Sequence, residues 1–206
     1  MSGQASRHAG AESGKRLLQR LLDDFAARPR PIRVVKKSLF WHQRAAGKAL
    51  FLITFGGQKT YLSHYVTTLG HTIYVPDDFD EWRAEYAIEV LRHEAVHVAQ
   101  FERYGWIGMI LLYGVLPLPV GLAYFRARLE WEAYEETLWA TAELEGLDEA
   151  RSPELRRKLV RRFTGPDYAW MWPFPRMVEG WIDKTLAEIE KSPDRKRPST
   201  KQARVR

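Results

Sequence analysis

Residues 90–99 read VLRHEAVHVA, and this stretch decides how the rest of the chain is interpreted. Two imidazoles, His93 and His97, stand four residues apart, and the carboxylate of Glu94 directly follows the first. On an α-helix this spacing puts both imidazoles on one face, one turn apart, where they can share a tetrahedral zinc ion. Glu94 would then lie beside the open position of the metal and could accept a proton from bound water. The pattern predicts a hydrolytic zinc site on a helix.

The neighbours of the two histidines favour a buried helix. Apart from Glu94, Arg92 is the only charged residue in this stretch. With six His in 206 residues, the pattern His-Glu-x-x-His arises by chance in about one such chain in a hundred. The alternative is an ordinary amphipathic helix with two polar core histidines, each of which would need a hydrogen-bond partner.

The stretch 90–99 resembles the extended signature of the zincin metallopeptidases. No His follows His97, so a third ligand must come from another residue type, and residues 128–134 read RLEWEAY. This second run resembles the Glu-x-x-Ala-Asp motif of gluzincins, as found in the CaaX-prenyl endopeptidases and their small bacterial relatives. The resemblance implies Glu130 as the third zinc ligand and Ala133 as the small residue that lets two helices approach. Tyr134 stands where the family has an Asp that orients a ligand His.

Other carboxylates in the same run leave an alternative open. Glu132 could replace Glu130 as the ligand, but Glu132, Glu135 and Glu136 together are also typical of a solvated helix face. A site of two His and one Glu keeps one position for water or substrate, as catalytic zinc sites do.

Before the site helix, glycines separate three runs rich in β-branched and aromatic residues, and these runs predict a small antiparallel sheet. They are Leu50 to Phe55, Lys59 to Thr67 and His71 to Val75. The resemblance to minimal gluzincins makes the last run the candidate edge strand that pairs with an extended peptide substrate. Its alternative is a hairpin strand that faces the core.

The 21 residues from Gly105 to Phe125 contain no charge. Their length could span a bilayer, but Pro117 and Pro119 argue against one continuous helix. We expect an apolar helical hairpin broken at 116–119, which either covers the core or makes peripheral contact with a membrane. Beyond it, Tyr168 lies in an aromatic loop and could donate a hydrogen bond to the oxyanion of a tetrahedral intermediate. The alternative for this loop is simple aromatic packing.

Length and charge predict one domain. Residues 1–14 are small and polar, and we expect a disordered N-terminus without a signal or anchor, followed by a single domain over 15–190. Residues 191–206 hold seven Lys or Arg against one Asp, a surplus equal to the net charge of +6 of the whole chain. We therefore expect a disordered basic tail and no specific nucleic-acid binding. The absence of cysteine is compatible with a cytoplasmic protein.

These observations predict an α+β fold of zincin type, with a small sheet before the site helix and a largely helical C-terminal half. The favoured function is a zinc metallopeptidase that acts on a peptide or protein, with His93, His97 and Glu130 as ligands and Glu94 as general base. The alternative is a non-catalytic module, either stabilised by zinc or vestigial, that binds a membrane or a partner protein through the apolar hairpin and the basic tail.

Overall fold

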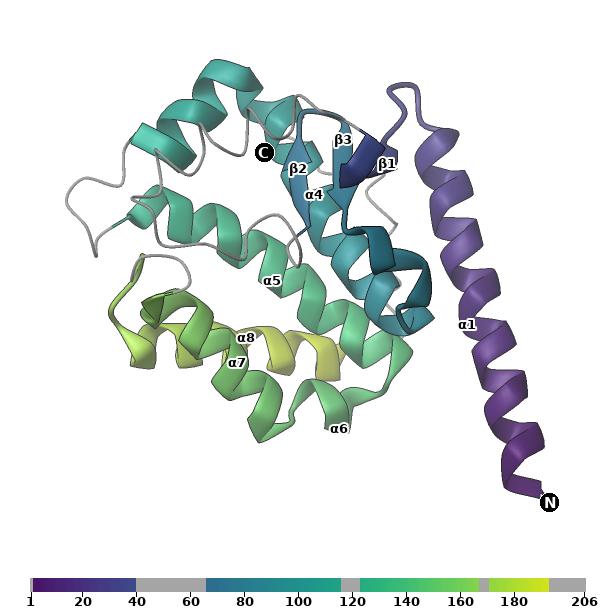
Figure 1. Cartoon of the computed structure of the whole chain (residues 1–206). Coiled ribbons are helices and arrows are strands. Elements are labelled where there is room, and N and C mark those ends of the chain that lie inside the picture. The colour runs from purple at the N-terminus through teal and green to yellow at the C-terminus, as the bar shows by residue number, and fades with distance from the viewer. Residues whose placement is uncertain (1, 40–65, 116–122, 167–170, 193–206) are drawn as a thin grey trace.

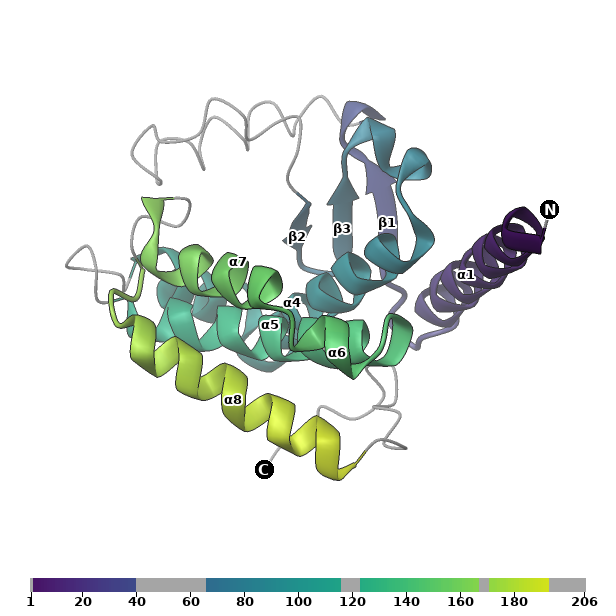
Figure 2. The ribbon, with the colours of Figure 1, turned by 90° about the horizontal axis from the view of Figure 1, so that it is seen from below.

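A computed structural model describes residues 2–39, 66–115, 123–166 and 171–192 of the chain. The order of elements is a long helix, a small sheet, a pair of long helices and three further helices (Figure 1). In Figure 1 the sheet lies toward the top and the last three helices lie toward the bottom, and Figure 2 shows the last helix on the side of the central helix pair away from the sheet. The chain is thus α+β and mostly helical, as its sequence predicts.

The sheet has three strands, β1 (Arg33–Lys36), β2 (Thr67–Leu69) and β3 (Thr72–Val75). Its order is β1-β3-β2, with β2 antiparallel and β1 parallel to β3. The predicted purely antiparallel sheet is therefore wrong, because β1 comes from a segment before the three runs named above. The runs at 50–55 and 59–67 fall outside the described residues, except for residues 66 and 67 at the end of the second run.

Strand β3 lies in the centre of the sheet, so it cannot serve as the edge strand for a peptide substrate. Both of its sides are already hydrogen-bonded, to β1 and to β2. Its alternating side chains explain this position, since Ile73 and Val75 are buried on the inner face while Thr72 and Tyr74 are half-buried on the other. The prediction for residues 71–75 is corrected to a central, core-facing strand.

Two hydrophobic cores meet at the central helix pair. One core packs the inner face of the sheet against α1 (Ser2–Ala26) and α4 (Ala84–Met109). Its residues on α4 recur at helical spacing and face one side: Ala87, Ile88, Leu91, Ala95 and Val98. The second core packs α5 (Tyr124–Leu144) against the helices that follow, α6 (Leu147–Ala150), α7 (Pro153–Thr164) and α8 (Pro175–Lys191). Helices α4 and α5 also contact each other along their length.

The uncharged run begins at a kink, because the span of α4 consists of two helices joined at Gly105, and the second of them lies in the uncharged run as the sequence predicts. Gly105 adopts φ 67° and ψ 177° inside α4, a conformation that suits glycine, and the chain leaves this kink in a new direction. A π-helical segment, η3 (Ile110–Val115), follows Met109. The predicted break at 116–119 lies outside the described residues, and Tyr124 and Phe125 already belong to α5. Within the described ranges no helix is both long and apolar enough to cross a membrane.

The structure describes most of the N-terminal segment but little of the C-terminal one. Helix α1 begins at Ser2, whereas composition predicts disorder for residues 1–14. Its side chains are described from Glu12 onward, and Leu21 and Phe25 belong to the sheet core. At the other end, all but the first two residues of the predicted tail at 191–206 lie outside the described residues.

Candidate metal centre

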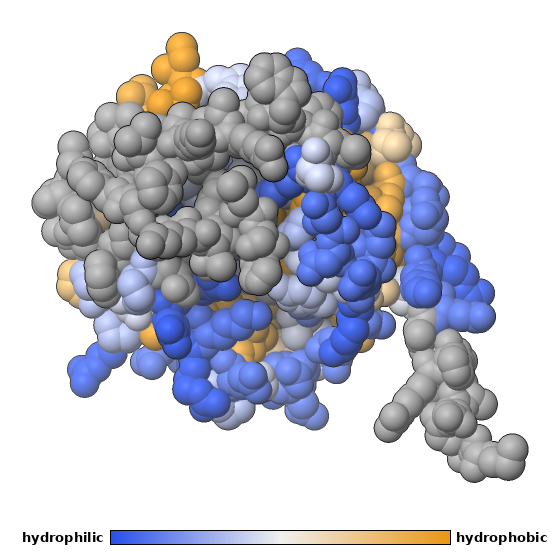
Figure 3. Space-filling view, in the orientation of Figure 1, coloured by the Kyte–Doolittle hydropathy of each residue, from blue (hydrophilic) through white to orange (hydrophobic). Residues whose placement is uncertain are grey.

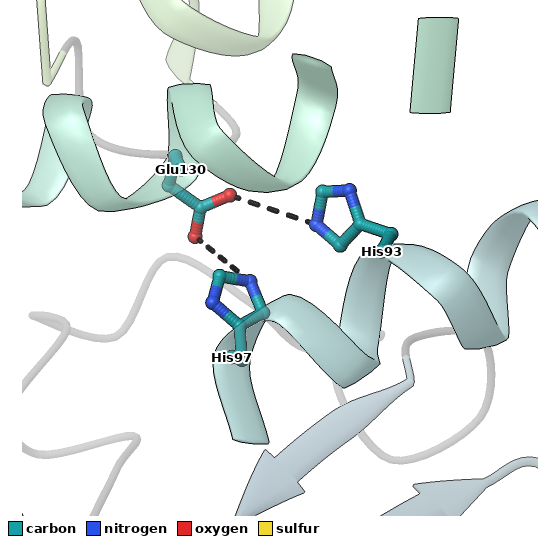
Figure 4. Close-up of side chains that lie close together, drawn as sticks. All are labelled: His93, His97 and Glu130. Carbon is teal, nitrogen blue, oxygen red and sulfur yellow. Dashed lines mark ion pairs between the residues drawn. The ribbon is translucent and has the colours of Figure 1, made fainter. Parts of the chain in front are cut away.

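Helices α4 and α5 bring the predicted ligands together. His93 and His97 lie on α4 and Glu130 lies on α5, and their side chains point toward a common centre (Figure 4). One potential ligand atom of each residue lies within 4.8 Å of the other two. The nearest imidazole nitrogen to Glu130 Oε2 is His93 Nε2 at 3.9 Å, and His97 Nε2 lies 4.0 Å from Oε1. Tetrahedral zinc would place such atoms about 3.4 Å apart, so a small inward movement suffices.

Burial of the carboxylate supports the fit to a cation. Glu130 is 1% exposed, and its Oε2 has no hydrogen-bond partner among the described residues. A buried, unpaired carboxylate oxygen is costly, and a metal ion at this centre would satisfy it. Ala133, one turn further along α5, is fully buried.

The alternative ligand Glu132 does not reach this centre. Its Oε2 accepts a 3.0 Å hydrogen bond from Gln100 Nε2 and lies 3.6 Å from the guanidinium of Arg103. Residues 130 and 132 are two positions apart on a helix and therefore point in different directions. The structure brings Glu130 to the histidines and turns Glu132 toward the neighbouring turn of α4.

Each histidine has a partner that fixes its ring. His97 Nδ1 lies 2.9 Å from Gln100 Oε1, an acceptor, so Nδ1 carries the proton and donates. His93 Nδ1 lies 3.1 Å from the hydroxyl oxygen of Thr137, which itself donates to the carbonyl of Ala133. Both arrangements leave Nε2 as the ring nitrogen that faces Glu130. Orienting partners of this kind are typical of metal-bound imidazoles.

Tyr134, which stands where the motif that the sequence resembles has an Asp, contacts His93 through its ring. The ring of Tyr134 meets the ring of His93 edge to face, with centroids 4.6 Å apart. Thr137 provides the hydrogen bond to His93 from one turn further along α5. The sequence motif gives no signal for Thr137, whereas Gln100 stands three residues after His97 on the same helix and could have been recognised by that spacing.

Glu94 is buried beside the triad and is held by the sheet. It is 8% exposed, and its Oε2 accepts a 2.6 Å hydrogen bond from the hydroxyl of Thr68 on β2. Burial raises the pKa of Glu94, while His97 and Thr68 act in the opposite direction. The result is a carboxylate with more affinity for a proton than an exposed glutamate has.

The two imidazoles differ in their protonation. Burial, together with repulsion from His97, lowers the pKa of His93 well below its usual value. For His97 burial also lowers the pKa, but the carboxylates of Glu130 and Glu94 outweigh it and raise the value. The surroundings thus favour the neutral, metal-binding form of His93, and a cation at the centre would compete with a proton for His97.

A tyrosine that sequence reasoning missed also contacts the site. The hydroxyl of Tyr113, in η3, donates a hydrogen bond to Glu130 Oε1, and its ring lies edge-on to His97 with centroids 6.3 Å apart. The guanidinium of Arg126 lies 4.9 Å from the centre of the Tyr113 ring. The sequence offers no signal for Tyr113, because the residue lies within the uncharged, apolar run. Tyr168, the phenol that the sequence singles out, lies outside the described residues.

An ion-pair network flanks the centre and ties the same two helices together. Arg92, next to His93, pairs with Glu136 at 2.6 Å and with Glu143 at 2.7 Å. Its side chain is only 11% exposed, so solvent screens these pairs less than surface pairs. The network accounts for Glu136, which the sequence places on a solvated face.

The donor set consists of two imidazoles and one buried carboxylate, with a further carboxylate alongside, and it could hold a metal ion. These groups come from α4 and α5, and the edge of the sheet holds the further carboxylate. Comparisons with known protein families, with curated proteins and with solved structures found no match to this chain.

Proposed function

We propose that this protein is a zinc metallopeptidase of gluzincin type, with a zincin-like arrangement of its site. One observation carries the proposal: His93, His97 and Glu130 converge within 4.8 Å, with Glu94 buried next to them. Local spacing alone explains the two histidines, but it does not explain why a carboxylate 33 positions after His97 is buried against both. A shared cation gives a physical reason for that placement.

Zinc at this centre would supply a Lewis acid for the peptide carbonyl and a bound water of lowered pKa. Glu94 is the proposed general base, because its carboxylate is buried, held in place by Thr68 and given a raised pKa by its surroundings. It would accept a proton from the attacking water and return it to the leaving amine. Gln100 and Thr137 would keep the two Nε2 atoms directed at the centre.

The edge strand β2 is the proposed contact for an extended peptide. Its one partner among the described strands is β3, and Thr68 in its centre touches Glu94. A peptide that added to the other side of β2 would therefore run beside the general base. This assignment replaces the predicted contact at residues 71–75.

A phenol is the proposed donor to the oxyanion that forms during hydrolysis. The hydrogen bond of Tyr113 to Glu130 supports this residue, since it places a hydroxyl donor next to a proposed ligand. Tyr168 remains a proposal for the same role. Tyr113→Phe and Tyr168→Phe would distinguish the two candidates, because only the variant that lacks the oxyanion donor should have a lower kcat.

The position of the site also favours a second candidate, a zinc ion that only stabilises the fold. His93 and His97 lie on the helix of the sheet core, and Glu130 lies on the helix of the second core. A structural zinc is closed by four protein ligands and a catalytic one has an open position. Three ligand residues form the described cluster, and Glu132 is directed elsewhere, which supports the catalytic candidate.

Peptide cleavage by a Glu94→Gln variant tests the proposal. The wild-type protein loaded with zinc should cleave members of a peptide library, whereas the variant should bind one zinc ion and cleave none. His93→Ala, which removes a ligand, should lose both zinc and activity. A Glu94→Gln variant as active as the wild type would contradict the mechanism. Zinc binding without cleavage of any library member by the wild type would favour the structural role.

A further inference from the structure

The helical turns after Gly105 expose large apolar side chains to solvent. Ile107 is 77% exposed, Ile110 is 57% exposed and Leu111 is 45% exposed. Their spacing of three and four residues places them on one side of the segment. In Figure 3 hydrophobic residues gather at the top of the view, where Figure 1 shows these turns. Among the described elements, none covers this side.

A basic groove lies next to these turns. It has a volume of about 610 Å³ and is open to solvent, and its walls include Arg30, Arg33, His71 and Trp106. The two arginines are exposed and form no ion pair with any residue that the structure describes. Two guanidinium groups at the mouth of an open groove attract an anion, and phosphate suits their planar donor geometry.

Trp106 joins the groove to the apolar turns. It directly precedes Ile107, it is 56% exposed, and it forms part of the groove wall. Gly70, with φ 59°, allows this close approach, because a Cβ atom there would lie 2.9 Å from Cζ2 of Trp106. The indole thus lies against the turn between β2 and β3, and it lines the groove that contains the two arginines.

We propose that the groove and the turns together form a docking face for the surface of an anionic membrane. Ile107, Ile110 and Leu111 would enter the boundary of the acyl chains, and Trp106 would lie at the level of the headgroups, where tryptophan is enriched. The phosphate of an anionic lipid would occupy the groove between Arg30 and Arg33. This order, apolar side chains, then an indole, then cations, matches the order of layers at a lipid surface.

The docking face is close to the metal centre along the chain. Ile110 and Leu111 belong to the same segment, η3, as Tyr113, whose hydroxyl bonds to Glu130. A lipid surface bound there would lie about one helical turn from a residue in contact with the site. The proposal does not depend on peptidase activity, since neither the groove nor the apolar side chains belong to the proposed catalytic groups.

Vesicle sedimentation of the full-length protein tests the proposal. Vesicles of phosphatidylcholine mixed with phosphatidylglycerol should bind it, and vesicles of phosphatidylcholine alone should bind it far less. The double variants Ile107→Ser/Ile110→Ser and Arg30→Glu/Arg33→Glu should each lower binding to the anionic vesicles by about tenfold or more. Unchanged zinc content and melting temperature would show that both variants are folded.

Matched controls separate this face from general charge and hydrophobicity. Arg157→Glu/Arg161→Glu makes the same change of net charge on α7, and Leu17→Ser/Met177→Ser removes two other exposed apolar side chains. Both controls should bind anionic vesicles as the wild type does. The proposal would be overturned if the wild type did not bind the vesicles, or if the charge control lost as much binding as Arg30→Glu/Arg33→Glu. It would also be overturned if Arg30→Glu/Arg33→Glu still bound them, because vesicle binding would then be due to the basic residues of 191–206. The proposal would also be overturned if the wild type bound no lipid but self-associated, and if Ile107→Ser/Ile110→Ser abolished the self-association. The occupant of the face would then be a second copy of this chain.

Discussion

The hydroxyl of Thr68 donates a 2.6 Å hydrogen bond to the Glu94 carboxylate, so the edge of the sheet positions the residue proposed as general base. Replacing Thr68 by Val keeps the shape of the side chain and removes the donor. We expect kcat to fall by about tenfold, in line with the value of a hydrogen bond to a charged group, while zinc content stays the same. Steady-state kinetics and metal analysis on the same preparation would measure both. Loss of zinc in this variant would show that Thr68 supports the metal site and not the base.

Glu130→Gln should weaken zinc binding by more than about 100-fold, because it removes a ligand and not an outer partner. Glu132→Gln is the matched control, since it makes the same change two residues away at a carboxylate bonded to Gln100 and Arg103. Competition with a chromophoric chelator would give both affinities. The opposite ranking of the two variants would make Glu132 the ligand.

Thr137→Val should reduce zinc affinity by about 10- to 100-fold, because the His93 ring loses the acceptor that fixes its orientation. Thr141→Val is the control: its hydroxyl donates to the carbonyl of Thr137 and touches neither histidine. Zinc affinity in the control should equal that of the wild type. If both variants bound zinc equally, ring orientation would not depend on Thr137.

Zinc should stabilise the whole protein, because its ligands belong to helices of two different cores. At a free zinc concentration of 100 times Kd, the free energy of unfolding should rise by about 2.7 kcal/mol. Thermal melts with zinc and with a chelator would show the shift, and His93→Ala should not respond. A zinc-dependent shift retained in His93→Ala would place the ion at another site.

Glu89→Gln should stabilise the protein near neutral pH. Burial raises the pKa of Glu89, and Glu145 acts in the same direction, so the folded state favours the protonated form. The contribution of Glu89 to stability is complete below its unfolded pKa and is lost as the pH rises through its folded pKa. At neutral pH the variant should gain roughly half a kcal/mol, a small value because the side chain is partly exposed. Melting temperatures should converge at acid pH, and a gain that persisted there would exclude ionisation as the cause.

The sequence by itself determined the site helix and two of the three proposed ligands. His93, Glu94 and His97 lie within five residues, and the period of an α-helix fixes their relative directions wherever the helix packs. The apolar residues of α4 repeat at the same period, so one face was predictable as core. Glu130 required the resemblance to a known motif, because no local rule connects residues on two helices.

Only the tertiary structure decided which groups support these residues and how the sheet is built. Thr68, Thr137 and Tyr113 reach the centre from other elements, and strand pairing and helix packing across long separations leave no periodic signal in the sequence. The pairing of β1 also has no periodic signal in the sequence. Because β1 pairs parallel to β3, β3 lies in the centre of the sheet and β2 lies at its edge beside Glu94. Local geometry is set by backbone period and side-chain type, whereas the neighbours of a buried carboxylate depend on how distant segments share one core.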